Sequence, residues 1–297
     1  MTEQPRSTEQ THPASADIDL KTTREILAVI NGEDQKIAQI VAAALDEIAH
    51  LVDQIYARFS TGGRLFYVGA GTSGRLGVLD ASEAPPTFGL PPGRVIGIIA
   101  GGVPALHSPS EISEDDPDAG AADLKSHDLS GKDSVVGIAA SGRTPYTLGA
   151  LRYARSVSAL TGCIVCVKNS AMAREVQCPV TVETGAEILA GSTRMKAGTA
   201  QKLVLNMIST ALMIRMGYVY GNLMIRLTMS NVKLMERGKQ IIMQTCGVDS
   251  ATAAQAIQDS GRDLRVAMLM LRQRLSAQAA RQKLAARSLR QILGEGR

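Results

Sequence analysis

The chain has 297 residues, of which 45% are hydrophobic and 20% are charged, with a formal net charge of +4, as in one large globular domain with helical additions. Aromatic residues make up only 3% and tryptophan is absent, which argues against nucleic-acid recognition by base stacking. No stretch approaches the ~20 uninterrupted apolar residues of a membrane helix, and the polar N-terminus shows no secretory signal, so we expect a cytoplasmic protein.

The first half of the chain predicts a helical arm followed by an α/β domain. Residues 22–60 repeat apolar side chains at helical spacing, and we expect an N-terminal helical arm over residues 1–53. Short, continuous apolar runs then alternate with helical segments, as in a parallel sheet covered by helices on both faces, and we assign residues 54–217 to this domain. The predicted strands are 64–69, 94–99, 134–139, 163–167 and 179–182, with helices near 73–82, 114–126, 144–159 and 170–176.

The second half of the chain is predicted to be helical. A long helix should begin near Ser192, a plausible N-cap residue, and end at Gly217. Residues 218–297 form a predicted C-terminal helical region, with breaks at Gly238, Gly247 and Gly261. Its excess of arginine is interpreted as the solvated face of amphipathic helices rather than as a patch for nucleic acid or membrane.

Two of the four cysteines, Cys163 and Cys166, have the CxxC spacing of some metal and redox sites. They lie in the apolar run CIVCV, which predicts a buried strand. Residues three apart on a strand point to opposite faces, so the two thiols are poorly placed to share a metal ion or a disulfide. We interpret them as structural thiols.

Two segments share one design, an apolar strand followed by a turn of Gly, Ser and Thr and then by a helix. The first is RLFYVGAGTSGRLGVLDAS at residues 64–82, and the second is DSVVGIAASGRTPYTLGALRYAR at 133–155. The first N–H groups of a helix lack intrahelical partners and, with the helix dipole, favour an anion such as phosphate. Hydroxyl groups add donors that can also bind sugar oxygens. Two such cradles in one sheet predict a sugar phosphate as the ligand.

The first turn, from Gly69 to Gly74, also matches the GxGxxG pattern of dinucleotide-binding folds. That interpretation requires an acidic residue at the end of the next strand to hold the ribose. The next strand, RVIGIIAGG, ends in Gly101 and Gly102 without an acid. A dinucleotide would also leave the second cradle without a ligand, so we favour the sugar phosphate.

Glu83 follows the first cradle, just before Pro85. Because proline disfavours the helical conformation of the residue before it, we expect Glu83 at a helix end. A continuous helix from Ser73 would carry Glu83 ~15 Å away from the cradle. Either that helix is short, with a break near Gly77, or Glu83 serves a site completed by another subunit.

At these loops the chain resembles the sugar isomerase (SIS) superfamily and, within it, the N-acetylmuramic acid 6-phosphate etherases. The most specific stretches are GAGTSGRLGVLDASEAPPTFG at 69–89, IAASGRTPYTLGAL at 138–151 and GSTRMKAGTAQKLVLNMIST at 191–210. The resemblance extends over nearly the whole chain. It implies a flavodoxin-like sheet of five parallel strands and a homodimer with the site near the interface.

The resemblance also implies a reaction, the removal of D-lactate from N-acetylmuramic acid 6-phosphate by elimination and then addition of water, with no metal or other cofactor. The two glutamates of that family match Glu83, as the proton donor, and Glu114, as the second acid–base group. The implied substrate-binding residues are Thr72, Ser73, Gly74, Ser141, Arg143, Thr144 and Ser192. A non-catalytic sugar-phosphate regulator, like the two-domain glucokinase regulatory protein, and a sugar-phosphate isomerase are the alternatives, and neither would release lactate.

Overall fold

The computed structural model describes residues 7–108, 112–229 and 231–294. The chain divides into two compact units, described separately below. Unit 1 contains the N-terminal residues up to Ser82 together with Gly93–Leu212, and unit 2 contains Glu83–Pro92 together with the residues from Met213 onward. None of the helices in the described part of the chain has the length and apolar character needed to cross a bilayer.

Unit 1 is built on a parallel five-stranded sheet in the order β2-β1-β3-β4-β5, which confirms the predicted α/β fold. Its strands are β1 (Leu65–Gly69), β2 (Val95–Ile99), β3 (Ser134–Ile138), β4 (Leu160–Val165) and β5 (Cys178–Thr181). β4 begins three residues earlier than predicted, because Leu160–Gly162 already pair with Ser134–Val136 of β3.

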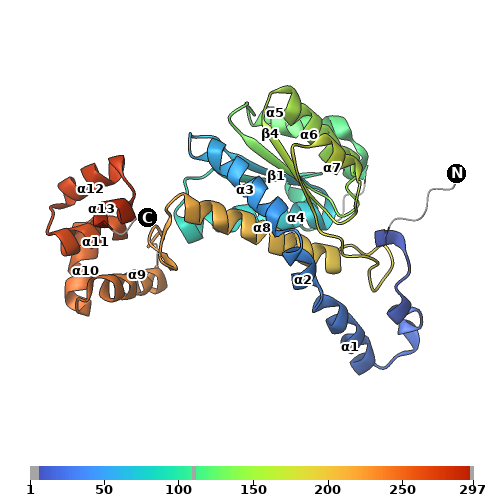
Figure 1. Cartoon of the computed structure of the whole chain (residues 1–297), viewed down its shortest axis with the longest axis horizontal. Coiled ribbons are helices and arrows are strands. Elements are labelled where there is room, and N and C mark those ends of the chain that lie inside the picture. Colours follow the sequence, from blue (N-terminus) through green and yellow to red (C-terminus); the bar gives the residue numbers. More distant parts are fainter. Residues whose placement is uncertain (1–6, 109–111, 230, 295–297) are drawn as a thin grey trace. The chain divides into compact units, whose positions relative to one another are not determined.

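Helices cover both faces of this sheet (Figure 1). One face carries α5 (Pro117–Ser126), α6 (Pro145–Ser156) and α7 (Ala171–Glu175), which bury an apolar core with alternate residues of the central strands. The other face carries α3 (Leu45–Phe59), α4 (Gly71–Phe88) and α8 (Lys196–Arg215). Because both faces are buried, the strands are predominantly apolar, which explains their continuous rather than alternating pattern.

The N-terminal segment, residues 7–42, consists of short helices, as the periodicity of the sequence predicts for its second half. It contains the 3₁₀ turns η1 (Ser7–Glu9), η2 (Pro13–Ser15) and η3 (Ile18–Leu20) and the helices α1 (Thr23–Asp34) and α2 (Ile37–Ala42). α1 begins with a capping box in which Thr22 and Glu25 satisfy each other's backbone N–H groups.

The prediction that α4 ends near Glu83 is wrong. α4 is one helix from Gly71 to Phe88, with Pro85 and Pro86 inside it. Two prolines remove two intrahelical donors, but the turn stays wound, and the N–H of Gly89 still donates to the carbonyl of Pro85 at 2.8 Å. The predicted break at Gly77 is absent too, because this glycine lets α4 pack directly on Tyr67 and Ile138.

Ser192 is not the N-cap of the long helix, which begins four residues later at Lys196. The N-terminus of α8 is instead satisfied by Glu187, a fully buried residue. Its carboxylate accepts hydrogen bonds from the backbone N–H groups of Lys196 and Ala197, both at 2.9 Å. A carboxylate distant from the helix start thus takes the capping role and complements the helix dipole.

Unit 2 contains a short hairpin as well as helices, so the expectation of an all-helical region is only partly correct. The hairpin is β6 (Val219–Tyr220) and β7 (Leu223–Met224), followed by α9 (Val232–Cys246), α10 (Ser250–Asp259), α11 (Leu264–Gln273), α12 (Ala277–Ala286) and α13 (Leu289–Leu293). α9 runs through Gly238, so the break predicted there is absent. The glycine instead leaves room for Met229, whose sulfur would lie 2.6 Å from a Cβ atom at this position. Gly247 does end α9, in the left-handed conformation.

The four cysteines are free thiols. Cys163 lies in β4 and Cys166 directly after it, and both side chains are buried, as the apolar run CIVCV predicts. Burial raises the pKa of each of these two thiols to about 12, so both are protonated at neutral pH. These are the properties of structural rather than reactive thiols.

Helices α5 and α6 touch backbone to backbone through two glycines. A Cβ atom on Gly149 would lie 1.9 Å from the carbonyl oxygen of Pro117, and one on Gly120 would lie 2.0 Å from that of Tyr146. We expect Gly149→Ala to lower the free energy of unfolding by ~1–3 kcal/mol, because the helices must separate to admit the methyl group.

Urea denaturation measures this change. Gly32→Ala is the matched control, because Gly32 lies inside α1 with no atom near its missing side chain. Alanine is the better helix former by ~1 kcal/mol, so the control should be neutral or stabilising. Equal effects of the two substitutions would contradict the close packing of α5 and α6.

Candidate active site

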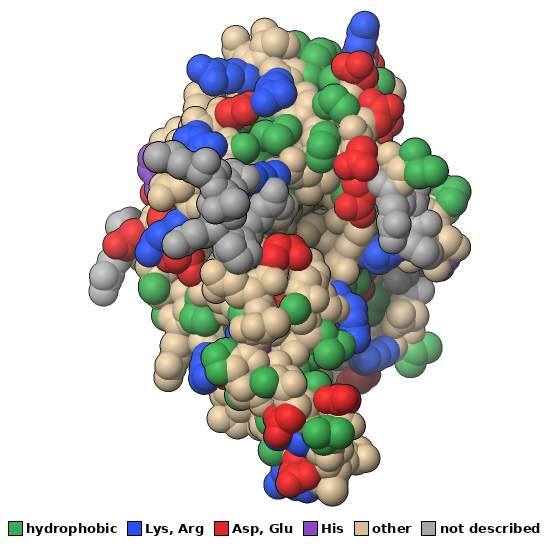
Figure 2. Space-filling model, turned by 90° about the vertical axis from the view of Figure 1, so that its right-hand side faces the viewer, with side chains coloured by type: hydrophobic (Ala, Val, Ile, Leu, Met, Phe, Trp, Pro, Cys, Tyr) green, Lys and Arg blue, Asp and Glu red, His purple; other side chains and the backbone are tan. Residues whose placement is uncertain are grey.

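The two phosphate cradles predicted from the sequence lie side by side. The first follows β1 and the second follows β3, and these strands are parallel neighbours at the centre of the sheet. The order β2-β1-β3 reverses direction at this point, where open α/β sheets form a crevice beyond the carboxyl ends of their strands. A pocket of about 400 Å³ occupies the place. Figure 2 shows the surface hollowed near the centre of one face, with acidic side chains at the rim.

The first cradle is the start of α4, where Thr72 and Ser73 line the pocket. Gly71 adopts a positive φ of 52°, which turns the chain from strand into helix. Gly74 lies behind the turn, and a Cβ there would meet the carbonyl oxygen of Gly69 at 2.6 Å. The hydroxyl of Ser73 donates to Gln201 of α8 at 2.9 Å, which fixes its direction.

A second polar contact joins α4 to α8 about two turns from the cradle. Asp80 is buried, and its carboxylate accepts hydrogen bonds from Asn206 at 2.9 Å and Ser209 at 3.1 Å. Burial raises the pKa of Asp80, against the effect of these hydrogen bonds. Since the helices are joined at both places, the start of α4 is held rigidly in the pocket wall.

The second cradle precedes α6 and contributes Ser141 and Thr144 to the pocket. Thr144 is the N-cap residue of α6, but its hydroxyl makes no capping hydrogen bond. Pro145 follows it at the first helical position, where a missing N–H costs nothing. The Thr144 hydroxyl and the free N–H groups of the first turn therefore face the same space as the first cradle.

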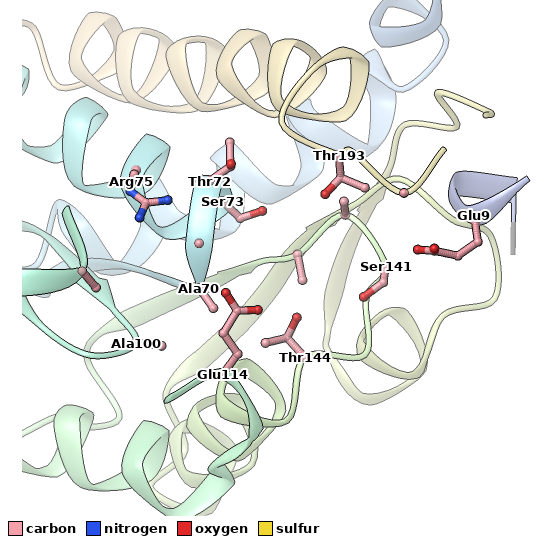
Figure 3. A pocket seen from close by; sticks show the side chains of 15 residues that line it. Glu9, Ala70, Thr72, Ser73, Arg75, Ala100, Glu114, Ser141, Thr144 and Thr193 are labelled. Carbon is pink, nitrogen blue, oxygen red and sulfur yellow. The ribbon is translucent and has the colours of Figure 1, made fainter. Parts of the chain in front are cut away.

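Glu114 lies between the two cradles (Figure 3). It belongs to the 3₁₀ turn η5 (Ile112–Asp115), directly before α5. A Cβ atom on Gly71 would be only 2.9 Å from its Oε1 atom, so the carboxylate lies against the start of α4. The close packing of α5 on α6 brings η5 to this place, which links the fold to the position of the carboxylate.

Arg75 is the only basic side chain among the residues that line the described pocket. Its guanidinium donates to the carbonyl oxygens of Leu106 at 3.3 Å and Ser108 at 3.4 Å. These carbonyls lie at the end of η4 (Val103–Leu106) and just after it, on the segment that leads towards Glu114. Arg75 therefore brings positive charge to the pocket and ties this segment to α4.

The opposite wall of the pocket comes from distant parts of the sequence. Gly191 and Thr193 belong to the loop before α8, and Glu9 belongs to η1 of the N-terminal segment. In Figure 3 the Glu9 carboxylate points towards Thr193 and Ser141. The pocket thus has hydroxyl groups on several sides, two carboxylates and one guanidinium.

Comparison with known proteins places this geometry in a family. Residues 47–155 match the model of the glucokinase regulatory protein N-terminal SIS domain. A protein of Edwardsiella ictaluri named N-acetylmuramic acid 6-phosphate etherase is 53% identical over 92% of this chain and 91% of its own length. A protein of the same name from Pectobacterium atrosepticum is 51% identical over 93% of this chain and 91% of its own length. The chain belongs to the N-acetylmuramic acid 6-phosphate etherase family.

A solved structure supports the fold of unit 1 independently of this sequence similarity. The E. coli CFT073 protein c3406 superposes with a TM-score of 0.50 over 68% of this chain and 97% of its own, at 16% identity. At that identity the likeness concerns the fold alone.

The structure brings together five of the nine site residues that the etherase resemblance and the cradles implied. Thr72, Ser73, Glu114, Ser141 and Thr144 all line the pocket. Gly74, Arg143 and Ser192 do not, although the N–H of Arg143 donates to the Ser141 hydroxyl at 3.3 Å. Glu83 is an exposed residue of α4, and the continuous helix carries it ~15 Å along the axis from Ser73.

The sequence patterns missed three pocket residues with functional side chains, Glu9, Arg75 and Thr193. Arg75 and Thr193 adjoin predicted residues, in GTSGR and GSTR, and the helical phase of α4 could have indicated the arginine. Glu9 carries no local signal, because it lies in a short polar turn far from any cradle in the sequence.

An ion cluster ties the N-terminal segment to the start of α8. Glu33 of α1 is 8% exposed and accepts from Lys196 at 3.0 Å and from His12 Nε2 at 3.1 Å, and it also pairs with Lys36. Burial raises the pKa of the Glu33 carboxyl, but the ammonium groups of Lys36 and Lys196 outweigh this effect and hold the pKa at about 2. Lys196 is itself buried, so the pair joins two segments inside the protein.

We expect this cluster to make stability depend on pH. A carboxyl whose pKa is lower in the folded chain stabilises the fold above its unfolded pKa, and the stabilisation is lost as the pH falls through the folded value. The unfolding free energies of the wild type and Glu33→Gln should therefore differ by up to ~3 kcal/mol above pH ~5. The difference should shrink as the pH approaches ~2. Urea denaturation at several pH values measures it, and a difference that stays constant with pH would contradict the cluster.

Proposed function

We propose that the protein cleaves the D-lactyl ether of N-acetylmuramic acid 6-phosphate, giving N-acetylglucosamine 6-phosphate and D-lactate in the recycling of cell-wall amino sugars. A base removes the proton from C2, which the aldehyde of the open-chain sugar acidifies. An acid protonates the ether oxygen as its bond to C3 breaks and D-lactate leaves. Water then adds across the resulting double bond, so that one water molecule is consumed overall.

The observation that carries this proposal is the position of Glu114 between two hydroxyl-rich helix starts in one pocket. A sugar phosphate needs donors for its phosphate and hydroxyls, and a proton transfer at carbon needs a carboxylate within reach of the held sugar. Helix N-termini supply the donors without a lysine, which agrees with the single basic side chain of the lining. The family name of the relatives at about half identity matches this chemistry.

Each residue has a distinct role in the proposal. Ser141 and Thr144, with the start of α6, and Thr72 and Ser73, with the start of α4, hold the phosphate and the sugar hydroxyls. Glu114 is an acid–base group that faces the reacting carbons. Arg75 keeps the segment before Glu114 in place through its two carbonyl contacts.

We further propose a cytoplasmic homodimer in which Glu83, the proton donor, completes the pocket of the partner subunit. The support is the length of α4. A continuous helix carries Glu83 ~15 Å from Ser73 of the same chain, farther than a side chain reaches. A second copy of the chain can present the same residue from another direction.

The test is the enzymatic release of D-lactate from N-acetylmuramic acid 6-phosphate by the purified protein. We expect stoichiometric D-lactate and N-acetylglucosamine 6-phosphate. Saturable binding of the sugar phosphate without any lactate would overturn the proposal and leave the two alternatives. An isomerase would then convert a sugar phosphate into its isomer, whereas a regulator would only bind it.

A further inference from the structure

We propose that Glu9 contacts the substrate and sets specificity for it. Its carboxylate accepts a hydrogen bond from a neutral donor of the sugar, which is a hydroxyl or an N–H group. The inference rests on the proposed function for the identity of the sugar phosphate. Glu9 lies in the N-terminal segment, outside both cradles, and is neither of the two glutamates, Glu83 and Glu114, that the proposed function uses.

The first argument is the environment of the carboxylate. Its Oε2 atom would lie 3.1 Å from a Cβ atom on Gly191, so it sits directly over that loop at the pocket edge. Within the ranges that the structure describes, no hydrogen bond or ion pair to the Glu9 carboxylate occurs. The carboxylates of Glu33, Asp133 and Glu187, by contrast, are all paired with protein donors. The oxygens of Glu9 therefore remain available to a ligand.

The second argument is that the position of Glu9 is fixed by its neighbours. The carbonyl oxygen of Thr8 accepts a hydrogen bond from the N–H of Gly191 at 3.1 Å, and the Thr8 side chain is fully buried. Farther along, His12 contacts Glu33, which pairs with Lys196. These contacts anchor the segment on both sides of Glu9, so its side chain is held at the pocket with little freedom of the backbone.

The third argument is charge. The substrate of the proposed reaction carries two anionic groups, the phosphate and the lactyl carboxylate. Like charges repel, and more strongly in a partly enclosed pocket than in water. Glu9 therefore cannot face either anion and must face the neutral part of the ligand. A carboxylate is an acceptor only, so the partner is a hydroxyl or an N–H group.

Isothermal titration calorimetry with two ligands tests the assignment. Glu9→Ala should weaken binding of N-acetylglucosamine 6-phosphate by about 10- to 100-fold, the effect of losing a hydrogen bond to a charged group. Glu9→Gln keeps an acceptor oxygen and should lose less. Both variants should bind inorganic phosphate as tightly as the wild type or more tightly, because a negative charge has left the pocket.

The matched control is Asp19→Asn, an exposed carboxylate on the same segment, in the turn η3. This control should bind both ligands like the wild type. Unchanged affinity of Glu9→Ala for the sugar phosphate would overturn the proposal. Equal losses for both ligands would overturn it too, because they would indicate a general disturbance of the pocket. Wild-type protein that binds the sugar phosphate but releases no lactate would refute the etherase reaction and leave the binding test of Glu9 valid.

Discussion

Replacing Glu114 with glutamine should lower kcat for D-lactate release by about 100- to 10,000-fold, the usual contribution of a general acid–base group. Glutamine has nearly the same shape but can neither accept nor deliver a proton at neutral pH. Glu114 lies against Gly71, and η5 together with the start of α5 brings it to the pocket. The variant should therefore fold normally and still bind the product. Steady-state kinetics, with calorimetry of N-acetylglucosamine 6-phosphate binding, separate the two effects.

Asp118→Asn is the control for this experiment. Asp118 is an exposed carboxylate in the first turn of α5, four residues from Glu114, and it does not line the pocket. Its substitution should leave kcat within about twofold of the wild type, because it changes an exposed side chain outside the pocket. An equally small change in Glu114→Gln would show that Glu114 takes no part in proton transfer.

Replacing Glu83 with glutamine should lower kcat by a similar factor of about 100- to 10,000-fold. The informative experiment is to mix this inactive variant with inactive Glu114→Gln and let the subunits exchange. In a shared site, a mixed dimer combines Glu114 of one chain with Glu83 of the other and has one intact pocket. Half of the dimers are mixed at equilibrium, so we expect about a quarter of the wild-type activity to return.

The mixing experiment distinguishes the shared site from a site within one chain. If both glutamates acted in the same chain, every pocket in the mixture would lack one of them, and no activity would return. A second check is the molar mass in dilute solution. A fully active protein with the mass of one chain, 31.4 kDa, would contradict the dimeric site.

The features that the sequence could predict are those encoded locally. Apolar runs such as LFYVG are buried on both faces of the sheet, so their pattern directly reports the strand β1. The turns at Thr72 and Ser141 were identifiable because several Gly, Ser and Thr residues together, between a strand and a helix, are typical of an anion-binding turn. The prediction that the two cradles lie close together then followed from the parallel sheet, because the carboxyl ends of all its strands lie at the same edge.

What the sequence could not predict depends on contacts between distant residues. Proline rules indicated a helix end before Pro85, yet α4 continues to Phe88. Ser192 looked like a cap, but the buried carboxylate of Glu187 satisfies the start of α8 at Lys196 instead. No local pattern could place Glu9 in the pocket, because tertiary contacts of its neighbours put it there. The division of the chain into an arm, an α/β domain and a C-terminal helical region at residues 53 and 217 stays a prediction.

The anchoring of the N-terminal segment has a consequence for the order in which the site forms during synthesis. Glu33 is made early, but its partner Lys196 follows 163 residues later. At ~5–20 residues per second, the ribosome needs roughly 10–30 s to cover that distance. Until then the segment that carries Glu9 has nothing to dock on, whereas β1 to β5 have already been made. A nascent chain would thus gain its sheet first and the wall that Glu9 belongs to last, so that the complete pocket appears only after Lys196 has been made.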